Sequence, residues 1–219
     1  MARLPRLIVA GQAHWVIHRG HSGRAVFADD LDRQAFVAAL HEAAATEQVR
    51  VHALSLQDAE VQLLANPPKA ASLSRMMQAL GRRYVSAHHR RHGGSGTLWE
   101  GRFRCAVVEP GATLLDVLCL IDALAVAGSA GHPRSGDPTP TILVDPPEYW
   151  LLGNTPFERQ AAWRHRLDEG LNPARSAALR QAALGGWAVG TADFAAQVGE
   201  QTARPAVPRP RGRPRLTTR

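Results

Sequence analysis

Residues 49–92, VRVHALSLQDAEVQLLANPPKAASLSRMMQALGRRYVSAHHRRH, contain the part of the sequence that decides the fold. Residues 49–55 and 60–65 are rich in apolar and β-branched side chains, and the short polar break between them is typical of a β-hairpin. Two prolines then end the sheet. A long helix follows, running to residue 92, and one stripe of it is apolar. That stripe consists of Leu73, Met76, Met77, Leu80, Tyr84 and Val85.

The flanking sequence extends this strand–strand–helix unit in both directions. Upstream, residues 13–18 alternate like a strand, and Asp29 and Asp30 precede a helical pattern that runs to about residue 46. Downstream, we expect a pair of strands followed by an apolar helix; their ranges are 98–103, 105–109 and 114–127. The order βαββαββα predicts an α+β fold with an antiparallel sheet and a layer of helices.

Composition divides the chain into four parts. Residues 1–130 carry the α+β pattern, and residues 131–148 form a linker rich in proline and glycine. Residues 149–202 hold two helical patterns, which predicts a small helical appendage at the C-terminal side. Residues 203–219 contain four prolines and no apolar periodicity, so we expect a disordered basic tail.

The positive charge is unevenly distributed. The chain has 26 basic and 19 acidic side chains, a formal net charge of +7, and six of the arginines fall within residues 204–219. A second basic zone, Arg75–Arg104, contains seven arginines and the single acid Glu100. The planar guanidinium group bonds phosphate in pairs, so two such clusters predict an anionic polymer as partner.

The tail contains a short motif, PRGRP at residues 210–214. It resembles the core of an AT-hook, in which glycine lets the backbone lie flat and the flanking arginines enter a narrow A·T-rich minor groove. We therefore expect Arg211, Gly212, Arg213 and Pro214 to contact DNA. The alternative is a merely basic tail that holds any phosphate backbone.

The sequence does not indicate a membrane-spanning, secreted, disulfide-rich or zinc-cluster protein. No apolar run approaches the length of a membrane span, and no secretory signal is recognisable at the start. Two cysteines, Cys105 and Cys119, do not make a disulfide framework or a zinc cluster. We expect a cytoplasmic protein that does not bind membranes. No segment indicates an oligomeric interface.

Several stretches together resemble one family, the REP-associated tyrosine transposases, which are bacterial relatives of the insertion-sequence transposases of the single-tyrosine HUH class. The longest and most specific block is LSRMMQALGRRYVSAHHRRHGGSGTLWEGRFR at 73–104. The other blocks cover residues 3–20, 27–40, 155–167, 185–194 and 208–215. The resemblance implies a ferredoxin-like antiparallel sheet and recognition of hairpins in single-stranded DNA. It also implies strand transfer, in which a strand with two histidines holds Mg²⁺ or Mn²⁺ and a helix supplies a nucleophilic tyrosine.

The chain departs from that family at the reaction centre. The positions that match the two histidines are Glu60 and Gln62, and the position that matches the tyrosine is Leu120. Leucine has no hydroxyl and cannot form a phosphodiester intermediate. The two tyrosines of the chain, Tyr84 and Tyr149, lie elsewhere. We therefore expect no catalytic residue and no metal or other cofactor.

The sequence thus predicts a catalytically degenerate DNA-binding member of this family. The expected DNA contacts in the body of the chain are Arg19, Arg82, Arg83, Arg90, Arg91, Arg102 and Arg104. One alternative is an active nickase in which the side-chain oxygens of Glu60 and Gln62 hold Mg²⁺. Another is a decayed gene product or a partner-binding module.

Three further features have structural interpretations. His88 and His92 have a spacing that can hold metal, but the interleaved arginines favour a solvated basic face. Cys119 is expected in the core. Trp99 is expected either to stack on a base or to be buried in the sheet.

Overall fold

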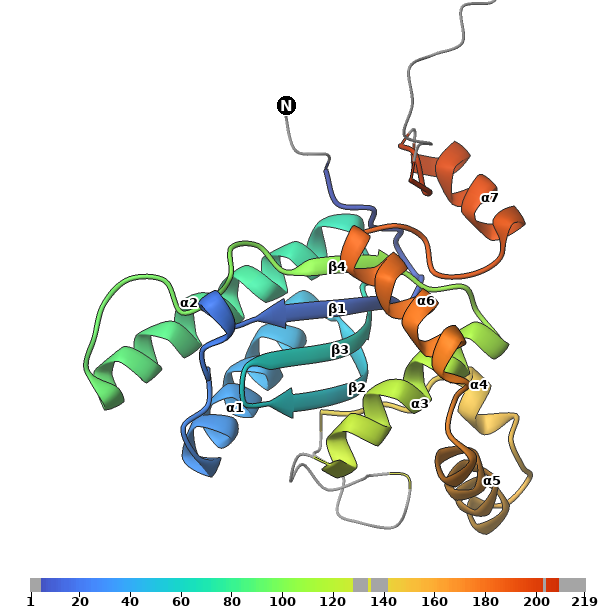
Figure 1. Cartoon of the computed structure of the whole chain (residues 1–219), viewed down its shortest axis with the longest axis horizontal. Coiled ribbons are helices and arrows are strands. Elements are labelled where there is room, and N and C mark those ends of the chain that lie inside the picture. Colours follow the sequence, from blue (N-terminus) through green and yellow to red (C-terminus); the bar gives the residue numbers. More distant parts are fainter. Residues whose placement is uncertain (1–4, 128–133, 135–141, 203, 209–219) are drawn as a thin grey trace, which may run out of the picture.

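The computed structural model describes residues 5–127, 134, 142–202 and 204–208. Four strands form one antiparallel sheet in the order β2-β3-β1-β4 (Figure 1). The predicted hairpin is present, with Gln57 paired to Glu60 at its turn. The strands are β1 His14–Arg19, β2 Arg50–Gln57, β3 Glu60–Asn66 and β4 Arg104–Val107. The α+β class and the antiparallel sheet predicted from the sequence are confirmed.

Two long helices cover one face of the sheet. They are α1 Asp30–Glu47 and α2 Ala70–His92, and they pack against each other. The side chain of Asp29 caps α1 by accepting a hydrogen bond from the Asp32 amide, as its position before the apolar pattern predicted. Because side chains alternate along a strand, every second residue of β3 faces these helices. The core on this side includes Val16, Phe36, Leu40, Val61, Leu63, Leu73 and Met76.

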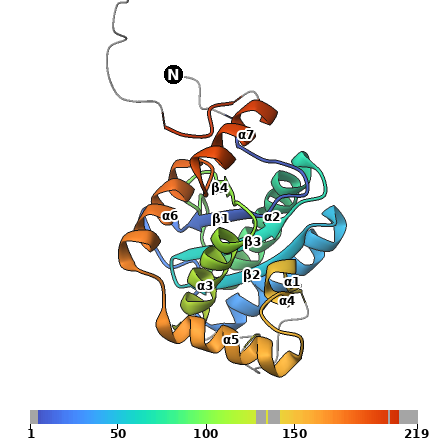
Figure 2. The ribbon, with the colours of Figure 1, turned by 90° about the vertical axis from the view of Figure 1, so that its right-hand side faces the viewer.

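The opposite face of the sheet is covered by helices from the second half of the chain (Figures 1 and 2). These are α3 Ala112–Ala127, α4 Pro147–Trp150, α5 Pro156–Glu169 and α6 Pro173–Gly185. Their core includes Trp15, Ile17, Leu64, Val117, Trp163, Leu179 and Ala183. Both sheet faces are therefore buried, which explains the continuous apolar runs in the strands.

The C-terminal helices, predicted as an appendage at 149–202, pack into this core. Trp163 of α5 is fully buried in the cluster that contains Trp15 of β1, and α6 contacts β4 and β1. A further helix, α7 Ala192–Thr202, buries Phe194 against Leu7. The proline- and glycine-rich composition before residue 149 does not predict which apolar faces of the later helices pack against the sheet.

The start of the predicted disordered tail is also ordered. Ala206 is 3% exposed, and its carbonyl oxygen accepts a hydrogen bond from the Ala188 amide at 2.8 Å. Nη2 of Arg204 donates to the carbonyl oxygen of Gly186 at 3.0 Å. One apolar side chain and two hydrogen bonds suffice to attach a segment without helical or strand periodicity. Residues 209–219, with the PRGRP motif, lie outside the described residues.

The predicted linker at 131–148 is described only at residue 134 and from residue 142 onward. There the chain runs beside β2, since the Val144 amide donates to the carbonyl oxygen of Val51 at 2.8 Å. Arg134 is buried and pairs with Asp122 and Asp145 at 2.7 and 2.9 Å. The described part of this segment is therefore packed against the domain.

Residues 98–103 do not form the predicted strand. Gly101 has a φ of +65°, a left-handed conformation that interrupts an extended chain, and only an isolated bridge joins Trp99 to Gly20. Trp99 is 7% exposed and stacks on the ring of His18 at a centroid distance of 4.1 Å. Of the two interpretations of Trp99, the structure shows burial.

Candidate nucleic-acid interface

A cleft between the sheet and α3 brings together the three positions at which the sequence departs from the transposase pattern. Glu60, Gln62 and Leu120 line one cavity of about 420 Å³, together with Trp15 and with Arg180 of α6. Residues 60 and 62 share a strand face because side chains repeat every two residues, and that face is turned toward α3. The three positions therefore lie together in one cavity of this structure.

The carboxylate of Glu60 is already surrounded by hydrogen-bond donors. Arg180 Nη2 lies 2.8 Å from both carboxylate oxygens, Arg19 Nε donates to Oε2 at 2.8 Å, and Gln62 Nε2 donates to Oε1 at 2.7 Å. Burial acts to raise the pKa of Glu60, but the hydrogen bonds from Arg180 and Arg19 outweigh it and lower the pKa below its usual value. The carboxylate is thus held ionised by two guanidinium groups.

The amide of Gln62 is likewise occupied. Its side chain is 1% exposed, and Oε1 accepts a hydrogen bond from the indole Nε1 of Trp15 at 3.0 Å while Nε2 donates to Glu60. Mg²⁺ needs several oxygen ligands whose lone pairs are not already taken by hydrogen-bond donors. Here the oxygens of both residues are satisfied by protein donors, two of them positively charged. The donor set therefore does not fit Mg²⁺ or Mn²⁺.

No tyrosine replaces the missing nucleophile. Tyr84 is 1% exposed and donates its hydroxyl to the carbonyl oxygen of Val26 at 2.5 Å, and Tyr149 is buried against Trp163. Burial raises the pKa of both phenols. Cys119 is buried as expected, and burial raises the pKa of its thiol to about 11. Neither tyrosine lines the cleft.

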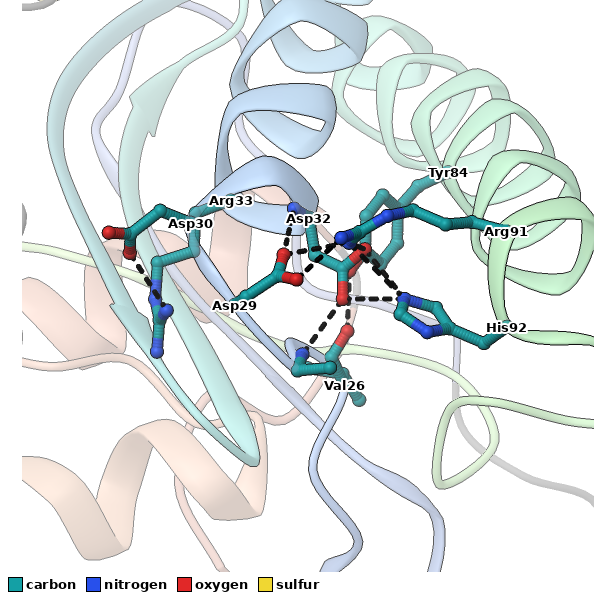
Figure 3. A network of polar contacts seen from close by, with 9 residues as sticks. Val26, Asp29, Asp30, Asp32, Arg33, Tyr84, Arg91 and His92 are labelled. Atoms are coloured by element: carbon teal, nitrogen blue, oxygen red, sulfur yellow. Dashed lines mark hydrogen bonds and ion pairs between the residues drawn. The ribbon is translucent and has the colours of Figure 1, made fainter.

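The arginines of α2 are more neutralised than the sequence suggests. Arg83 pairs with Glu42, and Arg75 pairs with Glu47. Arg91 lies between Asp29 and Asp32, with Nη1 at 2.7 and 2.6 Å from their Oδ1 atoms (Figure 3). These acids lie on α1 or at its N-cap, far away in the sequence. The expectation that this basic zone is almost free of neutralising acids is therefore wrong.

The predicted DNA contacts do not form one surface. Arg19 pairs with Glu60 on the α3 side of the sheet, whereas α2 covers the opposite side. Within the described part of the chain, Arg82 and Arg90 on α2 are exposed and form no ion pair. The remaining two, Arg102 and Arg104, lie together beside the edge strand β4. The tail residues 211–214 lie outside the described residues.

Arg102 and Arg104 line a groove with two arginines that the sequence did not single out. The groove has a volume of about 250 Å³, and Arg6, Arg204 and Trp187 also line it, with Glu100 as its one acid. The guanidinium of Arg6 lies over the ring of Phe103, 3.7 Å from its centroid. We call this set the arginine groove; its members are Arg6, Arg102, Arg104, Arg204 and Trp187.

The charges in the arginine groove are not fully compensated by the protein. Burial and the proximity of Arg102 lower the pKa of Arg6, and burial lowers the pKa of Arg204. Nε and Nη1 of Arg204 are buried and have no hydrogen-bond partner in the described residues. An anion bound in the groove would relieve the repulsion between the guanidinium groups of Arg6 and Arg102.

Sequence reasoning missed Arg6 and Arg204 as members of this groove. Both lie in stretches already marked as basic or family-like, but nothing in the linear pattern indicates that the two ends of the chain meet at β4. The same holds for Arg180, whose partner Glu60 is 120 positions earlier. The contacts of Arg6, Arg180 and Arg204 therefore follow from the tertiary packing and not from a local sequence pattern.

The fold and this site define a class of protein: an α+β domain with a four-stranded antiparallel sheet, an arginine groove at its edge and, on one face, the cleft that Glu60, Gln62 and Leu120 line. No helix among the described residues is long and apolar enough to cross a membrane. No known protein family profile matches the chain, and no curated protein matches it.

The solved structures that are similar to this chain include two transposases. One is a REP-associated tyrosine transposase bound to a REP hairpin, with 12% identity, a TM-score of 0.49, and coverage of 60% of this chain and 76% of the other. The second is a candidate transposase from Deinococcus radiodurans R1, with 19% identity, a TM-score of 0.39, and coverage of 56% of this chain and 98% of the other.

Proposed function

We propose that this chain is a transposase-like protein that binds DNA through the arginine groove and does not cut it. The observation that carries the proposal is the convergence of four guanidinium groups on one groove with a single opposing carboxylate. Arginine binds phosphate through paired hydrogen bonds, and the exposed side chains of Arg102 and Arg104 supply such donors in the groove. The groove therefore suits the backbone of a nucleic acid.

The finer proposal concerns the kind of DNA. The sequence resemblance favours hairpins in single-stranded DNA, whose unpaired bases can stack on an aromatic side chain. Trp187 is half-buried in the arginine groove and offers such a side chain. The tail motif at 210–214 would add contacts to an A·T-rich minor groove or to the phosphate backbone.

The occupied side chains of the cleft support the loss of strand transfer. Metal-assisted transfer needs a free metal site and a nucleophile, and here Glu60 and Gln62 are saturated by donors while position 120 is a leucine. The alternative of a nickase with an oxygen-only metal site would require two guanidinium groups to leave Glu60. The alternative of a decayed gene product predicts no retention on DNA.

We expect Arg102→Gln/Arg104→Gln to weaken binding to a labelled hairpin oligonucleotide. If about six phosphates are neutralised in the parent complex, log affinity falls with log salt at a slope of about −4 to −5, and losing two contacts reduces that slope by about 1.4 to 1.8. Fluorescence anisotropy over a salt series measures both effects.

The matched control for this experiment is Arg50→Gln/Arg164→Gln. It removes the same charge from exposed positions that do not line the arginine groove. It should leave the slope close to that of the parent chain. An equal loss in both double variants, or binding that is insensitive to salt, would contradict the proposal.

We expect no strand cleavage and no covalent adduct when the full chain is incubated with the same hairpin and Mg²⁺ or Mn²⁺. Denaturing gels of the labelled DNA and of the protein measure the two products. An adduct mapped to Tyr84 or Tyr149 would overturn the assignment of an inactive protein, because both hydroxyls are buried away from the cleft.

A further inference from the structure

A cluster of possible metal ligands lies where the end of α2 meets the start of α1, outside both the cleft and the arginine groove. His88 and His92 are one helical turn apart, with ring centroids 4.6 Å from each other. Nε2 of His92 lies 2.9 Å from both carboxylate oxygens of Asp32 (Figure 3). One nitrogen from each imidazole and one oxygen of Asp32 all lie within 4.8 Å of one another.

The environment of His88 differs from the solvated basic face that the sequence predicted. Its ring lies 6.0 Å from that of Tyr84, and its Nδ1 is buried without a hydrogen-bond partner in the described residues. An imidazole nitrogen without a protein partner is free to bind a metal ion.

The carboxylate of Asp32 contacts one guanidinium group, that of Arg91, whereas the carboxylate of Glu60 contacts two. Oδ2 of Asp32 accepts a hydrogen bond from the Ala28 amide at 2.8 Å, which fixes the orientation of the group. Its Oδ1 is shared with Arg91, but Arg91 also holds Asp29 through two hydrogen bonds of 2.7 and 2.5 Å. Arg91 therefore keeps a carboxylate partner if Oδ1 of Asp32 turns to a metal ion. Asp32 itself is 2% exposed, so its charge depends on such partners.

We propose that Asp32, His88 and His92 bind a transition-metal ion of the zinc type, at a site distinct from the proposed DNA groove. Two imidazole nitrogens and one carboxylate oxygen are a common donor set for Zn²⁺ and its neighbours, with the remaining position left to water. The donors come from two helices, so a bound ion would join the end of α2 to the start of α1. The sequence shows only the two histidines, because the third ligand lies 56 residues before His88.

The test is a titration of the full chain, purified without a polyhistidine tag and stripped of metal with a chelator. Co²⁺ serves as the first probe because its visible absorption reports the ligands, and Zn²⁺ is then added in competition. We expect one Co²⁺ per chain with a low-coordinate visible spectrum, and displacement of that ion by one equivalent of Zn²⁺.

The decisive variant is His88→Gln, since the imidazole Nδ1 of His88 has no hydrogen-bond partner among the described residues that the substitution would remove. It should weaken Co²⁺ binding at least tenfold and abolish the visible band, whereas His89→Gln, on the same turn, should bind as the parent chain does. Circular dichroism of the metal-free variants checks that the fold is kept, and Asp32→Asn provides a second test of the ligand set if His88→Gln is unfolded. Absence of the visible band in the parent chain, or unchanged binding by His88→Gln, would overturn the site.

Discussion

Lowering the pH from 7 to about 4.5 is expected to destabilise the fold by several kcal/mol, chiefly through His14 and His18. Burial lowers the pKa of each imidazole from its ordinary value of 6.5 to about 4. In the unfolded chain both titrate normally, so between pH 6.5 and 4 the unfolded state binds more protons than the folded state. Stability is therefore fully present above pH 6.5 and is lost as the pH falls through this window.

The size of this effect follows from the shift. One pKa unit corresponds to 1.36 kcal/mol, so each histidine contributes about 3 kcal/mol when the window is crossed completely. The geometry supports the assignment for His14: its Nε2 accepts a hydrogen bond from the Val9 amide at 3.1 Å, and its Nδ1 lies 2.9 Å from the Gln12 carbonyl oxygen. If Nε2 of His14 were protonated, it would become a donor that faces the N–H donor of Val9, and this hydrogen bond would be lost. His52, also buried, acts in the same direction.

Urea unfolding at pH 7, 6, 5 and 4.5 measures this prediction. The variants His14→Gln and His18→Gln should each show a weaker dependence of the unfolding free energy on pH than the parent chain. The exposed His41 on α1 provides the control, since His41→Gln should keep the parent dependence. A flat profile in the parent chain between pH 6.5 and 4.5 would contradict the prediction.

Trp163→Ala is expected to reduce the free energy of unfolding by about 3–5 kcal/mol, the range for truncating a fully buried tryptophan. The side chain is 0% exposed, and its ring meets that of Tyr149 edge-on at 5.9 Å. It lies in the same cluster as residues of β1 and α3, so its loss leaves a cavity in a core shared by both halves of the chain. Urea unfolding of the full chain measures the change.

The control is Trp150→Ala. Trp150 is 55% exposed and its main contact is the guanidinium of Arg159 over its ring at 4.4 Å, so its truncation should cost less than about 1 kcal/mol. We also expect the parent chain to unfold in one cooperative transition. Two separate transitions, with Trp163→Ala affecting only one, would restore the view that residues 149–202 are an appendage.

The secondary structure could be predicted because it depends on local patterns. The stripe from Leu73 to Tyr84 has helical spacing, and α2 indeed buries that side. The polar break before Glu60 produced the expected hairpin. The failure at residues 98–103 has an equally local cause, since Gly101 adopts a left-handed conformation that apolar patterning does not reveal. The sequence predicted disorder from residue 203 onward, but Ala206 is buried. Its packing could not be predicted because a single buried alanine leaves no periodic pattern in the sequence.

The cleft that Glu60, Gln62 and Leu120 line was predictable in part. Alternation along a strand places Glu60 and Gln62 on one face, and the resemblance to the transposases pairs that face with position 120. The structure confirms that these positions share a cavity. The ion pair between Arg180 and the carboxylate of Glu60 could not be predicted. Arg180 belongs to a helix that the sequence analysis placed in an appendage.

The sequence by itself determined the α+β class, the hairpin before α2, the helices α1, α2 and α3, and the leucine at position 120, because each of these depends on residue type and on spacing within one element. Only the tertiary structure decided which charges face each other. The acids of α1 neutralise Arg83 and Arg91, the two ends of the chain complete the arginine groove, and Asp32 meets His88 and His92. The physical reason is that Coulomb and hydrogen-bond interactions act over a few ångströms in space, whereas the partners here are 41 to 198 positions apart along the chain.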